Sequence, residues 1–264
     1  RGEESGAVNG QVGRRVEAGG AQMVRGTHRL NLLRGEKPRG NEWFRGLGRW
    51  RRNGRLLPQV PAGAALRAEM LEFLRHQPLA LHRADLRVVH ACWDDRAVAL
   101  AARERDVVTF FHKCRLALRD RLLHEPDQFR RSLSHQNGNP VSVLTSGLEA
   151  PVIGQPFWAG GKIRHTAREA WWSHYRHRSA VVFGHYWRSP LPYTALKPVP
   201  GPFGAGGGRE PYAPLGPRQN AWCIDYSVGY QLEELQRQPW KRQPDSRLAA
   251  LRWPEGQVLA TPPA

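Results

Sequence analysis

Residues 179–187 read Ser-Ala-Val-Val-Phe-Gly-His-Tyr-Trp, a short apolar run that leads directly into Gly184 and His185. Residues 179–183 are rich in β-branched and aromatic side chains and are too few for a helix, so they predict a buried strand. Gly184 permits a sharp turn directly after that strand, because glycine has no Cβ. The sequence therefore places His185 at the end of a strand, outside the packed interior.

Two further histidines have a similar context. Residues 86–92, Leu-Arg-Val-Val-His-Ala-Cys, predict a second short strand that carries His90 near its end, and residues 21–24 predict a strand that enters a loop holding His28. In open α/β sheets, ligands bind outside the strand ends, where loops converge. A single histidine in such a place is usually structural. The three together form a candidate metal or acid–base site, since neutral imidazole is a common metal ligand.

The remaining pattern predicts a mixed α/β protein. Apolar residues recur at helical spacing over 62–75, before Pro78, and over 97–123, which we expect to be the longest helix. We expect residues 1–20 to be a poorly ordered start or a remnant helix, closed at Gly19 and Gly20 by a glycine C-cap. A Pro- and Gly-rich loop is expected at 190–217. Further strands are expected at 222–228 and 248–253, followed by a turn at 254–256 and the apolar run 257–259.

The formal charge of +17 raises nucleic-acid binding as a function. Nearly all of the 40 basic residues are arginines, however, and they are scattered along the chain, whereas a nucleic-acid surface usually clusters them. The sequence carries no helix-turn-helix, zinc-finger or RNP-like signature. We therefore do not favour nucleic acid as the main partner.

No run approaches the roughly 18 apolar residues that would span a bilayer, and residues 1–20 carry no secretory signal. The three cysteines are widely spaced and form no CxxC pair, so neither a disulfide framework nor a zinc knuckle is predicted. We expect a cytoplasmic protein that does not bind membranes.

Several of these segments, taken in order, resemble motifs of the calcineurin-like metallophosphoesterases, particularly the bacterial branch near protein phosphatases and diadenosine tetraphosphatases. Residues 24–33, Val-Arg-Gly-Thr-His-Arg-Leu-Asn-Leu-Leu, resemble the Gly-Asn-His-Glu motif of that family. Residues 88–93, 183–187 and 223–227 resemble its next histidine-bearing strand, its Gly-His motif and the strand that follows. The resemblance covers roughly residues 10–260, and the chain is interpreted as an N-terminally truncated member.

The resemblance implies two packed β-sheets flanked by helices (α/β/β/α), formed by a partial metallophosphoesterase domain at 21–260 that lacks its N-terminal strands. It implies hydrolysis of phosphate esters at a dinuclear centre of Mn, Fe or Zn. His90 and His185 would hold the second metal, and His28 would be the general acid. Phosphorylated small molecules, nucleotides and phosphoproteins are all substrates that the resemblance allows.

The chain departs from the family pattern at two positions of the first motif. Thr27 stands where the family has a metal-ligating Asn, and Arg29 stands where it has Glu. No Asp precedes Asp85, so the aspartate ligands of the first metal are not in this chain. The prediction is therefore a centre of which this chain holds only the histidine part, with its own activity left open.

Three arginines flank the proposed ligands and suit bidentate phosphate binding: Arg25, Arg29 and Arg188. An alternative function is a catalytically degenerate domain that binds acidic partners or RNA through its basic surface. The substitutions at Thr27 and Arg29 favour this alternative.

Overall fold

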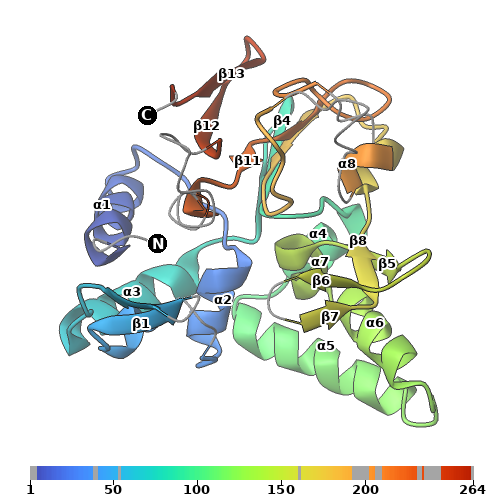
Figure 1. The fold of residues 1–264 in the computed structure, drawn as a ribbon, viewed down its shortest axis with the longest axis horizontal. Coiled ribbons are helices and arrows are strands. Elements are labelled where there is room, and N and C mark those ends of the chain that lie inside the picture. The colour runs from blue at the N-terminus through green and yellow to red at the C-terminus, as the bar shows by residue number, and fades with distance from the viewer. Residues whose placement is uncertain are drawn as a thin grey trace.

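A computed structural model describes residues 5–37, 41–52, 55–159, 162–191, 202–205, 210–230, 234 and 245–262. The chain is a mixed α/β protein that combines helices with several small β-sheets (Figure 1). This confirms the coarse fold class expected from the sequence.

The central sheet has four strands in the order β10-β9-β4-β3. These strands are β3 (Ala80–His82), β4 (Leu86–Val89), β9 (Ala180–Phe183) and β10 (Ala221–Cys223). Strand β9 is parallel to both of its neighbours, β4 and β10, and all four of its residues are buried. Burial on both faces explains why β9 is a continuous apolar run without alternation. The expected strands at 86–92 and 179–183 are confirmed, and both end just before their histidines.

Five helices lie between residues 64 and 146: α3 (Ala64–His76), α4 (Asp95–Ala101), α5 (Val107–Arg121), α6 (Gln128–Gly138) and α7 (Pro140–Ser146). Helix α3 confirms the helix expected at 62–75. The expected single helix over 97–123 is wrong, because the chain breaks between α4 and α5. The Asp106 carboxylate accepts the amides of Val108 and Thr109, at 2.8 and 3.2 Å, and so caps a new helix instead of continuing the old one.

The N-terminal region contains α1 (Ser5–Glu17), α2 (Thr27–Leu33), a 3-10 helix (Trp43–Arg45) and the hairpin β1 (Arg49–Arg52) and β2 (Arg55–Pro58). Helix α1 ends in the expected glycine cap: Gly19 has φ of 71°, and its amide and that of Gly20 donate to Val16 and Arg15. The strand expected at 21–24 is wrong. This segment is not part of any sheet, and α2 begins directly after Gly26.

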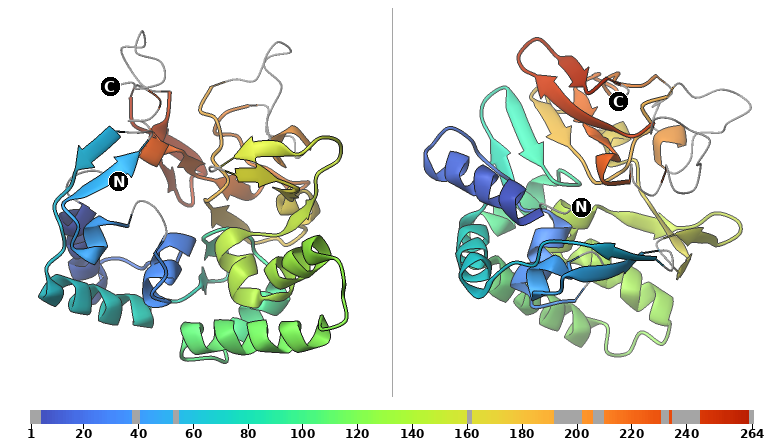
Figure 2. Two further views of the ribbon diagram at one scale, coloured as in Figure 1. Left: turned by 60° about the horizontal axis from the view of Figure 1, so that its bottom comes forward. Right: turned by 60° about the vertical axis from the view of Figure 1, so that its left-hand side comes forward.

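The second half is built from short strands. Two small antiparallel pairs are β5 (Glu149–Pro151) with β8 (Thr166–Arg168), and β6 (Phe157–Ala159) with β7 (Lys162–Arg164). A three-stranded sheet joins β11 (Asp225–Tyr226), β12 (Arg247–Arg252) and β13 (Gln257–Ala260). The connecting short helices are two 3-10 helices (Trp171–His174 and Val228–Tyr230) and α8 (Pro202–Ala205). Figure 2 shows the β1–β2 and β6–β7 hairpins on opposite sides of the molecule.

The C-terminal strands agree with the sequence except at one bend. Strands β12 and β13 and the turn between them confirm the expectation for 248–259. The expected strand at 222–228 is two strands, because β10 belongs to the central sheet and β11 to the three-stranded sheet. Of the loop expected at 190–217, residues 192–201 and 206–209 lie outside the described residues.

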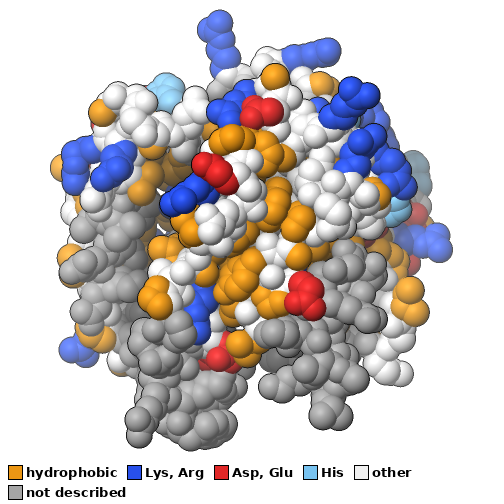
Figure 3. Space-filling view, turned by 90° about the horizontal axis from the view of Figure 1, so that it is seen from above, with side chains coloured by type: hydrophobic (Ala, Val, Ile, Leu, Met, Phe, Trp, Pro, Cys, Tyr) orange, Lys and Arg blue, Asp and Glu red, His pale blue; other side chains and the backbone are white. Residues whose placement is uncertain are grey.

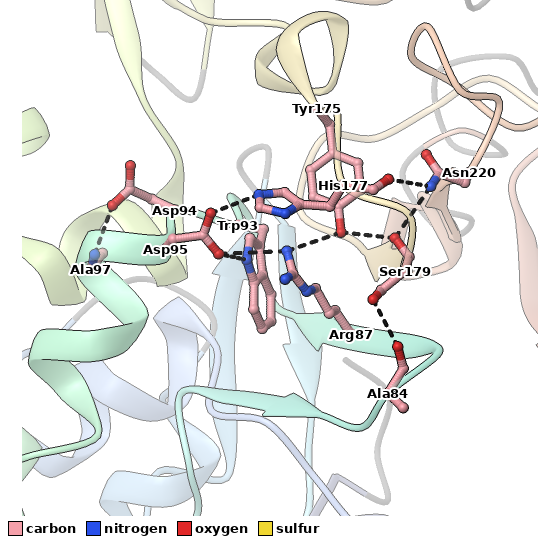
Figure 4. A network of polar contacts seen from close by, with 10 residues as sticks. All are labelled: Ala84, Arg87, Trp93, Asp94, Asp95, Ala97, Tyr175, His177, Ser179 and Asn220. Atoms are coloured by element: carbon pink, nitrogen blue, oxygen red, sulfur yellow. Dashed lines mark hydrogen bonds and ion pairs between the residues drawn. The ribbon is translucent and has the colours of Figure 1, made fainter.

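A polar network ties the start of the central sheet together (Figure 4). The Asp95 carboxylate accepts from Trp93 Nε1 at 2.9 Å and lies 2.7 Å from His177 Nε2 and 3.5 Å from the Arg87 guanidinium. The amide of Asn220, before β10, donates to the carbonyls of three residues just before β9: His177, Arg178 and Ser179. These contacts fix β4, β9 and β10 relative to one another.

The aromatic core lies beside this sheet. The Phe183 ring stacks on Trp172 at a centroid distance of 5.1 Å, and Trp172 stacks on Phe203 at the same distance. Within the part of the chain that the structure describes, no helix combines the length and the apolar character needed to cross a bilayer.

The side chain of Asn139 holds the start of α7 against α5. Its buried side chain donates to the Phe111 carbonyl at 3.0 Å and caps α7 by accepting from Val141 N at 3.1 Å. Asn139→Ala removes both bonds and leaves a buried carbonyl without its donor. We expect the free energy of unfolding, measured by urea denaturation, to fall by roughly 2–4 kcal/mol.

Asp94→Ala is the matched control. Asp94 caps α4 by accepting from Ala97 N at 2.7 Å, but it is not fully buried and bonds no other element. We expect a loss of about 1 kcal/mol. Equal losses for the two variants would contradict the structural role assigned to Asn139.

Candidate functional site

His90 and His185 follow directly from the two parallel strands at the centre of the sheet. The β4–β9 register pairs Val88 with Val182, and the pairing continues past both strands as a 3.0 Å hydrogen bond from Gly184 N to the His90 carbonyl. The two imidazole rings lie 5.1 Å apart between centroids, at an angle of 57°. The parallel pairing thus brings two histidines 95 positions apart into contact.

His28 approaches the pair from α2. It lies in the first turn of that helix, with an exposed side chain, and its charge is near enough to lower the pKa of both His90 and His185. The preceding Gly26 packs directly on the His90 ring: a Cβ at Gly26 would lie 2.5 Å from His90 Cε1. The structure therefore groups all three histidines.

Both sheet histidines are held neutral. Burial, with smaller effects of Arg29, His28 and Arg168, lowers the pKa of His90 from 6.5 to about 4. Burial, Arg168, His90 and His28 lower the pKa of His185 to about 2. Neutral imidazoles keep one nitrogen lone pair each for a ligand. The Nε2 of His185 is buried and makes no hydrogen bond to the described residues.

The backbone of His185 is constrained from both sides. Its φ of 70° is a left-handed conformation, which costs free energy in a residue other than glycine. Its amide donates to Asp225 Oδ2 at 2.9 Å, and its carbonyl accepts from the Arg168 guanidinium at 3.1 Å. Asp225 Oδ1 also accepts from Ser227 N at 3.0 Å. Asp225 therefore orients His185 through its backbone.

The other predicted site residues are placed as follows. Arg29 lies with the cluster, where its charge lowers the pKa of His90, and burial lowers the pKa of Arg29 itself. The hydroxyl of Thr27 is directed at α7, since it donates to the Thr145 carbonyl at 2.5 Å and lies 3.3 Å from Ser146 Oγ. Thr27 is thus held by α7, and its proton is already donated.

The guanidinium groups of Arg25 and Arg188 bond backbone carbonyls outside the histidine cluster, so their placement gives no support to the expectation that they bind a substrate phosphate there. Arg25 donates to the Arg75 carbonyl at the end of α3, at 2.7 Å. Arg188 is 1% exposed and donates to the carbonyls of Ala213 and Glu210, at 2.6 and 2.5 Å, which anchors the segment before β10. Sequence reasoning missed Arg168, because no local pattern distinguishes it from the many other arginines.

The metal-ligand set of the cluster is small. Among the described residues, no group of three or more His, Cys, Asp or Glu side chains is arranged to hold a metal ion. His90 and His185 suit a divalent cation as neutral donors, whereas the charges of Arg29 and Arg168 oppose one.

Comparison of the chain with protein-family models, curated proteins and solved structures gives no match. The function must therefore be inferred from the residues of the histidine cluster.

The contact between Gly26 and His90 leads to a second prediction. Gly26→Ala forces the new methyl group into the imidazole ring, so His90 or α2 must move. We expect a loss of roughly 1–3 kcal/mol in unfolding free energy, as in other overpacked sites. Shifts of the His90 ring signals in NMR spectra would report the displacement.

Gly63→Ala is the control, since Gly63 also precedes a helix with extended backbone and a Cβ there would meet nothing within 4 Å. Its loss should stay below about 1 kcal/mol and leave the His90 signals in place. Unchanged His90 signals in Gly26→Ala would contradict the close packing.

The lowered pKa values of the two histidines predict a pH dependence of stability. Below pH 6.5 the unfolded chain takes up protons at His90 and His185, whereas the folded chain does not until about pH 4. The free energy of unfolding therefore decreases as the pH falls from about 6.5 to about 4. Between pH 7.5 and 5 we expect each histidine to reduce the unfolding free energy by roughly 1–2 kcal/mol.

Urea denaturation at several pH values measures this effect. The double variant His90→Gln/His185→Gln should lose much of the slope between pH 7.5 and 5, whereas replacement of the exposed His124 by Gln should retain it. A double variant with the wild-type slope would show that these two histidines are not the buried neutral groups.

Proposed function

We propose that the chain is a metal-dependent phosphoesterase of the calcineurin-like type, with its site at the cluster of His28, His90 and His185. The supporting observation is the buried Nε2 of His185, which has no hydrogen-bond partner among the described residues and lies beside a second neutral imidazole. An unsatisfied buried polar atom is costly in a folded protein unless a ligand completes it.

A divalent cation, Mn, Fe or Zn, is the ligand of our proposal, held by His90 and His185. Such a cation polarises a phosphoryl oxygen and neutralises charge that develops there. Thr27 is not proposed as a ligand, because its hydroxyl is held by the Thr145 carbonyl.

The guanidinium groups of Arg29 and Arg168 are the proposed phosphate-binding groups. Burial lowers the pKa of both, and buried guanidiniums bind phosphate oxygens more strongly than exposed ones do. Arg168 also donates to the His185 carbonyl, so a phosphate bound there lies against the metal ligands. The exposed His28 is the proposed general acid, donating a ring proton to the leaving ester oxygen.

The layered fold of that family belongs to the same proposal. The four-stranded and three-stranded sheets would be its two packed sheets. In support, Gly256 in the β12–β13 turn lies against the Trp222 ring of β10, and Trp253 Nε1 donates to Asp85 Oδ2 at 2.6 Å.

The alternative function is that of a basic module that binds acidic partners or RNA. The observation that suggests it is the net charge of +17. On the described part of the face in Figure 3, Lys and Arg side chains lie mainly around the edge and apolar side chains occupy the centre. A scattered rim differs from the continuous basic track that a nucleic-acid backbone requires. We therefore prefer the phosphoesterase.

The opposing charges in the site predict that metal and phosphate bind together. Two guanidiniums repel a cation until an oxyanion lies between them. We expect the affinity for Mn²⁺, measured by calorimetry, to rise at least about tenfold in the presence of inorganic phosphate, equivalent to roughly 1.4 kcal/mol of coupling. Mn²⁺-dependent hydrolysis of p-nitrophenyl phosphate would show that the partial site held by this chain is itself active.

His185→Ala should abolish the coupling between metal and phosphate, and His124→Ala, an exposed histidine, should leave it intact. Absence of Mn²⁺ binding by the wild-type chain, with or without phosphate, would refute the proposed metal site. RNA binding that weakens steeply with salt and ignores Mn²⁺ would favour the basic module instead.

A further inference from the structure

A pocket lies beside Arg25, three residues before His28. It has a volume of about 830 Å³ and is enclosed by the end of α3, by β3, by α4 and by the start of α5. Its floor is apolar, with Leu79, Val107 and Phe110 each less than 10% exposed. The size and apolar lining are typical of pockets for small organic ligands.

Arg25 is the buried charge in this pocket. Its side chain is 2% exposed and belongs to the pocket lining. One guanidinium nitrogen donates to the Arg75 carbonyl, and Nε has no hydrogen-bond partner among the described residues. The carbonyl end of α3 offsets the charge only in part, because a helix end carries about half an elementary charge.

Apart from the exposed Arg105, the other Arg, Asp and Glu side chains that line the pocket already have partners. Arg75 and His76 both contact the Glu72 carboxylate, at 3.1 and 2.9 Å. Glu104 pairs with Lys113 at 3.6 Å. Asp106 accepts the Val108 and Thr109 amides and the Thr109 hydroxyl. Within the described chain, Arg25 forms no ion pair within 4.0 Å.

Burial of this charge without a counter-ion is unfavourable. Desolvation lowers the pKa of Arg25 to about 10, and the nearby Asp106 carboxylate opposes that effect. Arg25 therefore remains a cation at neutral pH. A buried cation that borders an open pocket suits a ligand that supplies the missing negative charge.

We propose that this pocket binds an amphipathic monocarboxylate, with the carboxylate on the Arg25 guanidinium and an apolar tail over Leu79, Val107 and Phe110. A single carboxylate matches the one buried cation that has no ion pair, since Glu104 pairs with Lys113 and Arg75 with Glu72. The Asp106 carboxylate near Arg25 disfavours a second negative charge there. The tail follows from the apolar floor. This site goes beyond the phosphoesterase function and does not depend on it.

The position of Arg25 in the chain gives the site a route to the histidine cluster. Arg25 is bonded to Gly26, which packs on the His90 ring. Its own amide donates to the Pro78 carbonyl at 2.8 Å, so the segment is held on the pocket side. A carboxylate on Arg25 would stiffen the residue next to the glycine that supports His90.

Calorimetric titration with octanoate tests the binding site, and octan-1-ol is the probe with the same tail and no charge. For the wild-type chain we expect octanoate to bind about ten- to hundredfold more tightly than octanol, as a charge-assisted bond to a buried guanidinium provides. Arg25→Met should remove that preference and bring octanoate to the octanol affinity. Arg105→Gln, which removes an exposed cation of the same pocket, should reduce octanoate binding less than threefold.

Ala102→Phe provides a variant that leaves Arg25 in place. Ala102 is exposed and lines the pocket, so a phenyl ring there fills the space without disturbing the core. Ala102→Phe should abolish binding of both octanoate and octanol. This variant tests the pocket even if Arg25→Met does not fold. Equal affinities for octanoate and octanol in the wild-type chain, or octanoate binding that survives Ala102→Phe, would overturn the proposal.

Discussion

The hydrogen bond from Gly184 N to the His90 carbonyl, 3.0 Å long, continues the parallel pairing of β4 and β9 beyond the last paired residues. Parallel strands end at the same edge of a sheet, so whatever follows each strand must meet its counterpart there. In this chain the residues that follow are His90 and His185, and their rings touch. The polar network around Asp95 and Asn220 acts at the opposite ends of these strands and holds the same register. The site is thus a consequence of sheet topology, and small shifts in the strand pairing would separate its two sheet histidines.

The same geometry explains the electrostatic character of the site. Two imidazoles that are buried together cannot both carry charge, and the arginines beside them reinforce the neutral state. Burial is the largest cause of the lowered pKa at both histidines, and Arg168 is the largest charge effect at His185. The result is a pair of uncharged donors within a cationic surround, which disfavours a lone metal ion and favours an anion. We propose a metal ion together with a phosphate because such a ligand would satisfy both parts of this environment.

The sequence predicted the strands that matter and misplaced several elements where side-chain contacts override local pattern. The apolar run before His185 needs only short-range information, because burial on both faces leaves few alternatives. Residues 97–123 have helical periodicity throughout, yet Asp106 caps a new helix, since its carboxylate bonds the amides that follow it. Residues 21–24 have strand-like composition but pair with no strand. Arg168 could not be found from sequence, because its role depends on a carbonyl 17 residues away whose position is set by the fold.

Four consecutive residues connect three different environments, which is unusual for so short a segment. Arg25 reaches into the pocket between α3 and α5, Gly26 packs on His90, Thr27 lines a pocket of about 580 Å³ beside α5, α6 and α7, and His28 joins the histidine cluster. Gly26 has extended backbone, whereas Thr27 and His28 lie in the first turn of α2, and this change of conformation directs the neighbouring side chains to different places. Only glycine fits at position 26 without displacing a neighbour, since the His90 ring occupies the space that a Cβ would need. Gly26 thus joins Arg25, which lines one pocket, to Thr27, which lines the other, and it packs on His90 between them.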